Sequence, residues 1–355
     1  MRFHLVLVAS FLGLLFRTSP SASLRVGSFN LRFDSQPDDI DVATTLSALG
    51  DPLQEPAYLA NVSEQPWSTR RVWAAELLLH RGVEVFGVQE ALIRQVKDLK
   101  GLLGSGWDLV GVGRDDGKEA GEYSAIFFYN STLELLDFDS FWTSETPFEP
   151  SKYEDAGHNR ICTVAHFQPK DGSKLTVFNT HLDDQSEDQR RLAASLIFYR
   201  ARYEAVKTDG PVLVMGDFNS PPTGDHSGAY NISIGTLDPK AINETFADKY
   251  AVDDDQQPDF ILFDLRGETE RRRVSGNFAT FQGFTSPEET DKWGRIDFIF
   301  GGSNGHWWVS YQGVSKTSST ERSRKSEAYH VDSSLTDDGL YISDHRPVCV
   351  DVSLD

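Results

Sequence analysis

Hydrophobic residues gather along this chain in short runs that are typical of buried strands. Such runs recur after residue 23; they are rich in Val, Ile and Phe and bounded by Gly, Pro, Asp or Asn. They cover residues 24–31, 83–90, 107–113, 123–130, 160–167, 174–181, 211–219, 295–300 and 347–354. We expect each run to form a strand of a buried sheet.

Two other segments carry apolar residues at helical spacing. Residues 68–80 follow a Ser/Thr cap, and residues 186–206 open with Ser186 and two acids before Leu192 and Leu196. Sheets covered by such helices form an α/β sandwich. Because neither a repeat nor a low-complexity linker divides the chain, we expect a single domain over residues 24–355. The polar stretches are predicted to be long connections, and they cover residues 34–65, 223–276 and 315–340.

The first 23 residues have the pattern of a secretory signal peptide. Arg2 precedes an apolar run over residues 5–16, and small residues follow at 19–23, which predicts cleavage near residues 21–23. The apolar run is too short to span a bilayer comfortably, and an N-terminal membrane anchor is the alternative. We therefore expect a secreted, extracellular protein with no stable membrane insertion.

Two further features bear on export. Asn-X-Ser/Thr sequons, which accept N-glycans in a eukaryotic secretory pathway, occur at Asn61, Asn130, Asn231 and Asn243. Cys162 and Cys349 would pair in an oxidising compartment. Both cysteines lie in strand-like runs, so a buried free thiol is an equal alternative at each.

The chain is strongly acidic, with 54 Asp and Glu against 34 Lys and Arg and a net charge of −20. Non-specific binding to a long polyanion usually comes from Lys and Arg that neutralise phosphates, so this balance disfavours it. Turnover of nucleic acid stays open, because a bound metal ion reverses the charge locally.

Polar side chains stand where the strand-like runs begin or end. They are Asn30, Glu90, Asn179, His181, Asp217, Asn219, Asp297, Asp344 and His345. Carboxylates, amides and imidazoles are the groups that a hard divalent metal and a phosphate ester require. Each alone has an ordinary explanation: Glu90 as a helix N-terminal acid, Asp297 as a partner of Arg295, Asp217 as part of an Asx turn. Their joint occurrence favours one active site.

The order of these motifs resembles the endonuclease/exonuclease/phosphatase superfamily from residue 24 to the C-terminus. The matching segments are Phe29-Asn30-Leu31-Arg32, Gln89-Glu90, Asn179-Thr180-His181-Leu182, residues 216–221, Arg295-Ile296-Asp297 and Ser343-Asp344-His345-Arg346-Pro347. Residues 113–129 and 179–191 look most like the deadenylase- and nocturnin-related branch and its small metal-hydrolase relatives. The resemblance implies a four-layer α/β/β/α sandwich with two packed, mostly antiparallel sheets.

The resemblance also implies metal ligands. Glu90 looks like the principal ligand of Mg²⁺ or Mn²⁺, with Asn30 beside it and Asp344 as a further ligand. Some branches carry an acid two residues after the first Asn, and Arg32 stands there in this chain. A second acidic ligand at that position is therefore not expected, which moves the interpretation away from the apurinic endonucleases.

The same resemblance implies roles around the phosphate. Asp217 looks like the group that orients or deprotonates the attacking water, and Asn219 positions it. His345 looks like the donor to the phosphate, oriented by Asp297. His181 looks like the second histidine; residues matched less securely are Glu122 as its orienter and Arg160 as a contact to a substrate phosphate.

We therefore expect a secreted, monomeric, Mg²⁺-dependent phosphoesterase that hydrolyses a phosphodiester in RNA, DNA or nucleotides. The alternative is a phosphatase or phosphodiesterase of small or lipid phosphates, such as sugar phosphates, inositol phosphates or sphingomyelin. A non-catalytic binding module is least favoured, because every chemical position is filled. Aromatic residues at 138–142 and 278–284 are expected to pack in the core rather than stack on a base, and His158 is expected in a solvated loop.

Overall fold

The computed structural model describes residues 23–51, 54–55, 63–170, 172–208, 210–285, 288–305 and 325–353. The predicted signal peptide, apart from its last residue, and Asn61 lie outside these residues, as do residues 315–324 of the predicted connection 315–340. The described remainder of that stretch contains a strand over Lys325–Val331, so the prediction of a connection is wrong there. Within the described part of the chain, no helix is both long and apolar enough to cross a membrane.

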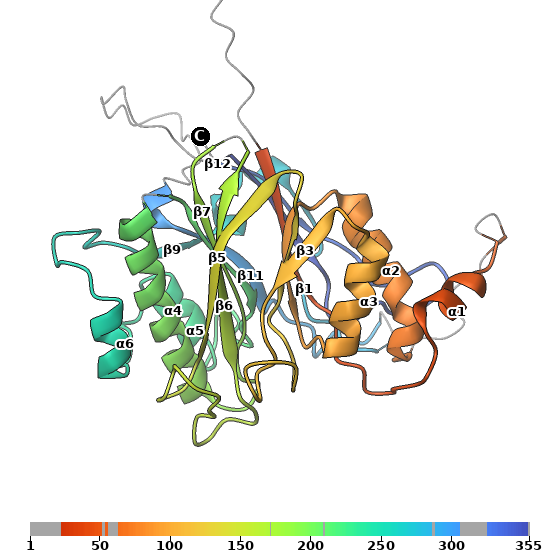
Figure 1. Cartoon of the computed structure of the whole chain (residues 1–355), viewed down its shortest axis with the longest axis horizontal. Coiled ribbons are helices and arrows are strands. Elements are labelled where there is room, and N and C mark those ends of the chain that lie inside the picture. Colours follow the sequence, from red (N-terminus) through yellow and green to blue (C-terminus); the bar gives the residue numbers. More distant parts are fainter. Residues whose placement is uncertain are drawn as a thin grey trace, which may run out of the picture.

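Two packed sheets form the centre of the molecule (Figure 1). The seven-stranded sheet has the order β10 (Val274–Gly276), β12 (Lys325–Val331), β13 (Val348–Ser353), β1 (Ser23–Asn30), β2 (Val85–Gln89), β4 (Ile126–Tyr129) and β3 (Trp107–Val110). The six-stranded sheet has the order β5 (Leu133–Trp142), β6 (Ile161–Pro169), β7 (Leu175–His181), β8 (Val212–Asp217), β11 (Asp297–Gly302) and β9 (Leu262–Asp264). Neighbouring strands are antiparallel except in the pairs β1–β2, β7–β8 and β10–β12.

Helices cover the outer face of each sheet (Figure 1). The seven-stranded sheet carries α2 (Trp67–Arg81) and α3 (Ile93–Leu103), with α1 (Val42–Ser47) beyond them. The six-stranded sheet carries α4 (Glu187–Thr208), with α5 (Gly228–Ser233) and α6 (Glu244–Lys249). Short elements complete the chain: α7 (Leu265–Glu268), η1 (Arg271–Arg273) and η2 (Ser303–Gly305). The predicted four-layer sandwich with mostly antiparallel sheets is confirmed.

Three hydrophobic clusters hold the four layers together. One lies between the sheets and joins Val26 and Val350 to Val177 and Met215. The other two lie between each sheet and its own helices. This arrangement explains why the strand-like runs are apolar over nearly their whole length, since both faces of the central strands are buried.

The two cysteines belong to different outer clusters, so they do not pair. Cys162 lies in the cluster under α4, whereas Cys349 lies in the cluster under α2 and α3. Both are free and buried. A disulfide needs Cα atoms about 4.4–6.8 Å apart, and two packed sheets separate these thiols. Of the two alternatives left open by the sequence, the buried free thiol is the one that holds.

Every predicted strand run contains a strand, but other elements differ from expectation. Helix α2 begins at Trp67 after Pro66 with no side-chain cap, so the expected Ser/Thr cap is wrong. Ser186 does cap α4, because its Oγ accepts a hydrogen bond from Gln189 N at 3.1 Å. The stretch 223–276 was expected to be a connection, yet it holds α5, α6, β9, α7 and β10.

Candidate active site

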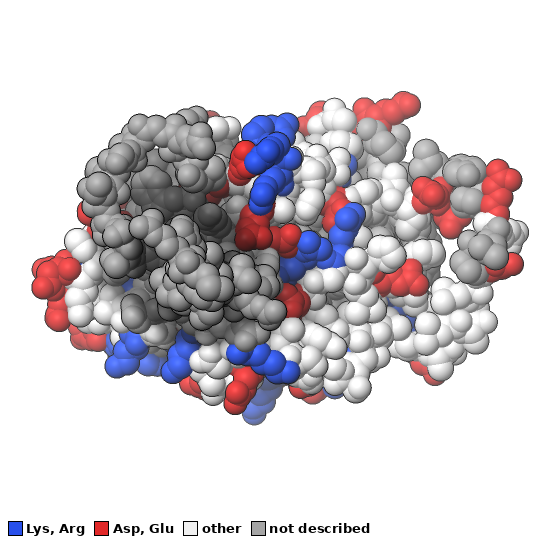
Figure 2. Space-filling view, turned by 90° about the horizontal axis from the view of Figure 1, so that it is seen from above, with Lys and Arg blue, Asp and Glu red and all other residues white. Residues whose placement is uncertain are grey.

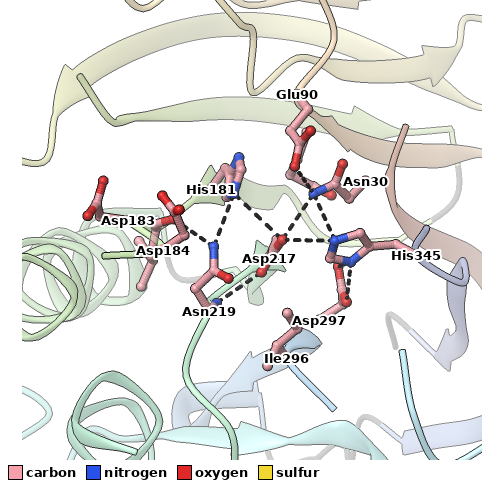
Figure 3. A network of polar contacts seen from close by, with 12 residues as sticks. Asn30, Glu90, His181, Asp183, Asp184, Asp217, Asn219, Ile296, Asp297 and His345 are labelled. Carbon is pink, nitrogen blue, oxygen red and sulfur yellow. Dashed lines mark hydrogen bonds and ion pairs between the residues drawn. The ribbon is translucent and has the colours of Figure 1, made fainter. Parts of the chain in front are cut away.

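The register of the sheets explains why polar strand ends meet at one rim. Asn30 is paired with Gln89, His181 with Asp217, and Asp297 with Asp217. The parallel pairs end together, and the antiparallel strand β11 begins where β8 ends. Figure 3 shows Asn30 and His181 converging on Asp217, with Asp297 behind His345.

Asn179 lies beneath this rim and joins the two sheets. Its Nδ2 donates to the carbonyl oxygens of Val88 at 2.9 Å and Ala125 at 2.8 Å, and its Oδ1 accepts from Gln89 Nε2 at 2.6 Å. A Cβ on Gly87 would lie only 2.4 Å from Asn179, so glycine is required there. Asn179 therefore supports the site without facing the pocket, which differs from the expectation that it contributes chemistry.

Asp217 occupies the middle of the site and is held on both carboxylate oxygens. Its Oδ1 accepts from Asn219 N at 2.9 Å, and its Oδ2 accepts from Asn30 Nδ2 at 3.0 Å. The same Oδ2 lies 3.6 Å from His181 Nε2 and 3.6 Å from His345 Nε2. Burial and then the charge of Asp297 raise the pKa of Asp217 to about 7. A carboxylate poised there suits proton abstraction near neutral pH.

His345 is held as a cation. Its Nδ1 lies 2.9 Å from Asp297 Oδ2, and its ring meets that of Phe281 edge-on at 5.0 Å. Burial alone would lower the pKa of His345, but the carboxylates of Asp297 and Asp217 outweigh it and hold that pKa well above its ordinary value. The Nε2 proton can therefore be offered to an anionic oxygen in the pocket.

His181 is held neutral on the other side of Asp217. Burial and the positive charges of Arg160 and Arg114 lower the pKa of His181 well below its ordinary value. Its Nε2 lies 3.2 Å from Asn219 Nδ2, and its Nδ1 lies 3.8 Å from Glu122 Oε2. The predicted pairing of Glu122 with His181 is thus a loose one, and Glu122 is bonded more closely to Arg114 Nη1 at 2.5 Å.

Glu90 and Asp344 form an acidic end of the pocket that could hold a metal ion. Glu90 has a left-handed backbone (φ 61°), and its carboxylate is bonded to Asn30 Nδ2 at 2.9 Å and Phe33 N at 3.1 Å. Burial raises the pKa of Asp344, and the negative charge of Glu90 adds to the effect against the opposing charge of His345. Carboxylate oxygens are hard ligands, and a divalent cation bound between them would relieve their mutual repulsion.

The acid and imidazole atoms form two further sets with metal-like spacing. Within each set the ligand atoms lie within 4.8 Å of one another; the sets are Glu90, His181 and Asp217, and Asp217, Asp297 and His345. We favour the Glu90 end, because His345 and Asp297 already satisfy one another at 2.9 Å. Asn30 touches both Glu90 and Asp217, so it links the metal end to the central carboxylate.

The site forms a pocket of about 330 Å³. Of the predicted residues, Glu90, Glu122, Arg160, His181, Asp217, Asn219, Asp344 and His345 line it, while Asn30 and Asp297 lie behind them. Lining residues that the sequence did not single out for a role are Phe33, Asp184 and Ile296. Arg32, noted only as a departure from the family pattern, also lines it.

One expectation about the pocket wall needs correction. His158 is exposed in a loop, as expected, and it also lines the pocket. Phe281 lines the pocket as well, whereas the segment 278–284 is expected to pack in the core. In the other aromatic segment, Phe141 and Trp142 are buried as expected and Phe138 is exposed.

Comparisons with known proteins agree with this fold. The model of the Endonuclease/Exonuclease/phosphatase family matches residues 27–345. The search of curated proteins gave no match. Among solved structures, an endonuclease/exonuclease/phosphatase from Bacteroides vulgatus is 26% identical, with a TM-score of 0.66, over 94% of this chain and 100% of that one.

Two more solved structures are similar to the chain over nearly its whole length. A mannosyl-6-phosphatase from Bacteroides thetaiotaomicron is 25% identical, with a TM-score of 0.64, over 93% of this chain and 99% of that one. The human nocturnin catalytic domain with bound sulfate is 14% identical, with a TM-score of 0.56, over 94% and 95%. The second likeness shows a shared fold.

Proposed function

The chain belongs to the Endonuclease/Exonuclease/phosphatase family, and on that premise we propose that it is a divalent-metal-dependent hydrolase of a small phosphate ester. One observation carries the proposal: the buried carboxylate of Asp217 lies between two imidazoles and beside the acidic end of the same pocket. A base, a cationic donor and a metal-binding end are the parts that phosphate ester hydrolysis requires.

Asp217 is the proposed general base. Its two hydrogen bonds, from Asn219 N and Asn30 Nδ2, fix the carboxylate so that it accepts a proton from a water aligned for attack. General base catalysis by a positioned side chain contributes roughly 10²–10⁴-fold in rate.

His345 is the proposed donor to the phosphate. Its Nδ1 proton is held by Asp297, which leaves the Nε2 proton for a non-bridging oxygen of the substrate. The negative charge that develops on the phosphate during attack makes this contact stronger in the transition state than in the ground state. His181, held neutral, is placed to contact a second phosphate oxygen or the leaving group.

Glu90 and Asp344 are the residues that would hold the metal. Asn30, which was expected to bind it too, supports Glu90 from behind through its Nδ2, while its Oδ1 accepts from Arg32 N at 2.9 Å. A bound divalent cation supplies positive charge that neutralises the non-bridging and leaving oxygens of the ester. The role of Arg32 is separate: its side chain is bonded to Glu64 at 3.0 Å and lies over the Phe33 ring at 4.3 Å. A guanidinium fixed in this way can contact a substrate oxygen without a large loss of entropy.

The balance of charge favours a small substrate over a polymer. The pocket carries two arginines, Arg32 and Arg160, against a larger set of carboxylates that comprises Glu90, Glu122, Asp184, Asp217 and Asp344. On the face of the molecule shown in Figure 2, Lys and Arg lie in small groups beside Asp and Glu. The 25% identity to a mannosyl-6-phosphatase supports a sugar phosphate as the first candidate. Phosphodiester hydrolysis is the second candidate, supported by the same catalytic groups.

A substrate panel tests the proposal. Mannose 6-phosphate, inositol phosphates, nucleotides, sphingomyelin and short RNA and DNA strands are incubated with Mg²⁺, with Mg²⁺ and excess EDTA, and with the Asp217→Asn variant. We expect release of phosphate or of a smaller ester only in Mg²⁺ with the unchanged chain. Full activity in EDTA would overturn the metal dependence, and no turnover of any ester would overturn the proposed function.

Export, glycosylation and a monomeric state belong to the same proposal. Asn130 is exposed, and Asn231 and Asn243 are partly exposed. Expression in a eukaryotic secretory host should give medium-borne protein whose mass falls after glycosidase treatment, with light scattering at the mass of one chain. Retention in the cell or a dimer mass would contradict these parts.

A further inference from the structure

The wall of the pocket away from Glu90 carries an exposed carboxylate that is held in place. Asp184 Oδ1 accepts a hydrogen bond from Arg160 Nη2 at 2.7 Å, and the Asp184 side chain is 53% exposed. Arg160 itself is buried, with its side chain 4% exposed. Figure 3 shows Asp184 on the His181 side of Asp217, opposite Glu90 and His345. Asp184 is therefore fixed at the rim rather than free in solvent.

The neighbouring acid shows what a purely structural carboxylate looks like here. Asp183 is fully buried, and it accepts hydrogen bonds from the backbone N–H groups of Gln185, Ser186 and Gly157 at 2.9–3.0 Å. It also accepts from Arg160 Nε at 3.2 Å. The hydrogen bonds that Asp183 accepts fix the turn before α4. Among the described residues, Asp184 accepts a hydrogen bond only from Arg160, so its carboxylate can accept further hydrogen bonds from a molecule in the pocket.

The arginine that holds Asp184 has a further donor without a partner. Among the described residues, no hydrogen-bond acceptor meets the buried Arg160 Nη1, and a buried donor without a partner is costly. Arg160 lines the pocket together with Asp184. This wall thus carries a guanidinium next to a fixed acceptor, Asp184.

The chemistry of this wall selects the kind of group that it binds. A carboxylate repels a phosphate, so Asp184 does not face the phosphate itself. Phe33 and Phe281, the phenylalanines that line the pocket, lie at the Glu90 and His345 end, so among the described residues the Asp184 wall offers imidazoles but no phenyl or indole ring for stacking on a base. Neighbouring donors and acceptors match hydroxyl groups, each of which both donates and accepts.

We propose that Asp184, positioned by Arg160, binds the hydroxyl groups of the alcohol half of the substrate, and so makes the enzyme selective for phosphate esters of polyhydroxy alcohols. This inference rests on the proposed function and adds its substrate class. A site built to hydrogen-bond a hydroxyl discriminates strongly against an analogue that lacks it.

The test compares two esters in the unchanged chain and in Asp184→Ala. Mannose 6-phosphate carries the hydroxyl groups, and 4-nitrophenyl phosphate carries none on its leaving group. We expect Asp184→Ala to lower kcat/KM for mannose 6-phosphate at least about tenfold more than for 4-nitrophenyl phosphate, mainly through KM, because hydrogen bonds to a charged group are among the strong ones. Asp184→Asn, which keeps the shape and one acceptor oxygen, should give a smaller change in the same ratio.

Asp188→Ala is the matched control, because it removes one exposed acid from the first turn of α4 outside the pocket. It should leave the ratio of the two kcat/KM values unchanged, and thermal unfolding of each variant checks that it folds. If Asp184→Ala lowered kcat/KM equally for both esters, or for neither, the role of Asp184 would be overturned and the proposed function would stand. Failure of the unchanged chain to hydrolyse either ester in Mg²⁺ would count against the proposed function itself.

Discussion

Two histidine–carboxylate pairs in this molecule have the same separation and different surroundings. In the site, His345 Nδ1 lies 2.9 Å from Asp297 Oδ2; on β6 and α4, His166 Nε2 lies 2.9 Å from Glu204 Oε2. The second pair joins a helix to its own sheet, because Glu204 is on the inner face of α4 and His166 is on the strand beneath it. The distance between the two atoms therefore does not distinguish a catalytic pair from a structural one.

The two pairs differ in the other charged groups that contact them. Glu204 Oε1 accepts from Arg200 Nε at 2.6 Å, and Arg200 lies over the Tyr250 ring at 3.9 Å. Burial opposes the charge on Glu204, but the hydrogen bond from His166 and the charge of Arg200 lower its pKa below the ordinary value. In the site, by contrast, the Nε2 of His345 meets a further carboxylate, Asp217, whose pKa is raised to about 7. The charged groups around Glu204 pair with one another, whereas the charged groups around Asp217 remain able to pair with a ligand.

The largest expected effect comes from neutralising the central carboxylate. Asp217→Asn should lower kcat/KM by roughly 10²–10⁴-fold, because the base is lost while the shape is kept. The variant should unfold at the same temperature as the unchanged chain or higher, since a buried carboxylate with a raised pKa is removed. Steady-state kinetics and thermal unfolding measure both; normal turnover by the variant would exclude Asp217 as the base.

The matched change in the second cluster should have the opposite pattern. Glu204→Gln leaves the buried Arg200 without its nearest counter-charge, and removing one partner of a buried pair costs about 3–5 kcal/mol. Its activity at a temperature where it stays folded should be within about twofold of the unchanged chain, because the loss of this ion pair acts on folding rather than on the pocket. Chemical denaturation gives the free energy of unfolding. A loss below about 1 kcal/mol would show that the cluster is not a structural ion pair of this kind.

The two clusters should also respond to pH in opposite directions. The pKa of Asp217 in the folded chain is raised from 3.8 to about 7, so its contribution to stability is present in acid and lost as pH rises through 7. The pKa of Glu204 is lowered from 4.5, so its contribution is present above that value and lost as pH falls below it. In metal-free protein, the advantage of Asp217→Asn in melting temperature should therefore grow between pH 5 and pH 8. The deficit of Glu204→Gln in melting temperature should shrink below about pH 4. If the melting-temperature differences of both variants changed with pH in the same way, the comparison would be contradicted.

The smallest expected effect concerns metal binding at the acidic end of the pocket. A ligand at one hundred times its dissociation constant stabilises the folded state by about 2.7 kcal/mol. Mg²⁺ should therefore raise the melting temperature of the unchanged chain and of Glu204→Gln, but Glu90→Gln should show less of this rise at the same concentration. Calorimetric titration with Mg²⁺ gives the affinity directly, and an equal affinity in Glu90→Gln would place the metal elsewhere.

Much of the fold followed from hydrophobic patterning, because central strands with two buried faces must be apolar throughout. The strand run at 211–219 and the strand β8 show this agreement. Strand β5 was missed, because it is an edge strand with two exposed acidic residues, Glu134 and Asp137, on a partly solvated face. Edge strands need not carry a continuous apolar signal.

Those residues of the candidate site that stand in local sequence motifs could be predicted. Asp217 and His345 stand in recognisable segments at strand ends, so they were found. The position of Asp184 depends on a hydrogen bond from Arg160, which lies just before β6, and no local pattern marks that contact. His158 and Phe281 enter the pocket from loops whose paths are set by tertiary packing.

The most direct test of the proposed chemistry is the rate of phosphate release from mannose 6-phosphate in Mg²⁺ by three proteins: the unchanged chain, Asp217→Asn and Glu204→Gln. We predict turnover by the first and third and a loss of roughly 10²–10⁴-fold in the second, with all three folded at the assay temperature. Comparable rates for Asp217→Asn and the unchanged chain, or an equal loss in Glu204→Gln while it is folded, would contradict the assignment of Asp217 as the base.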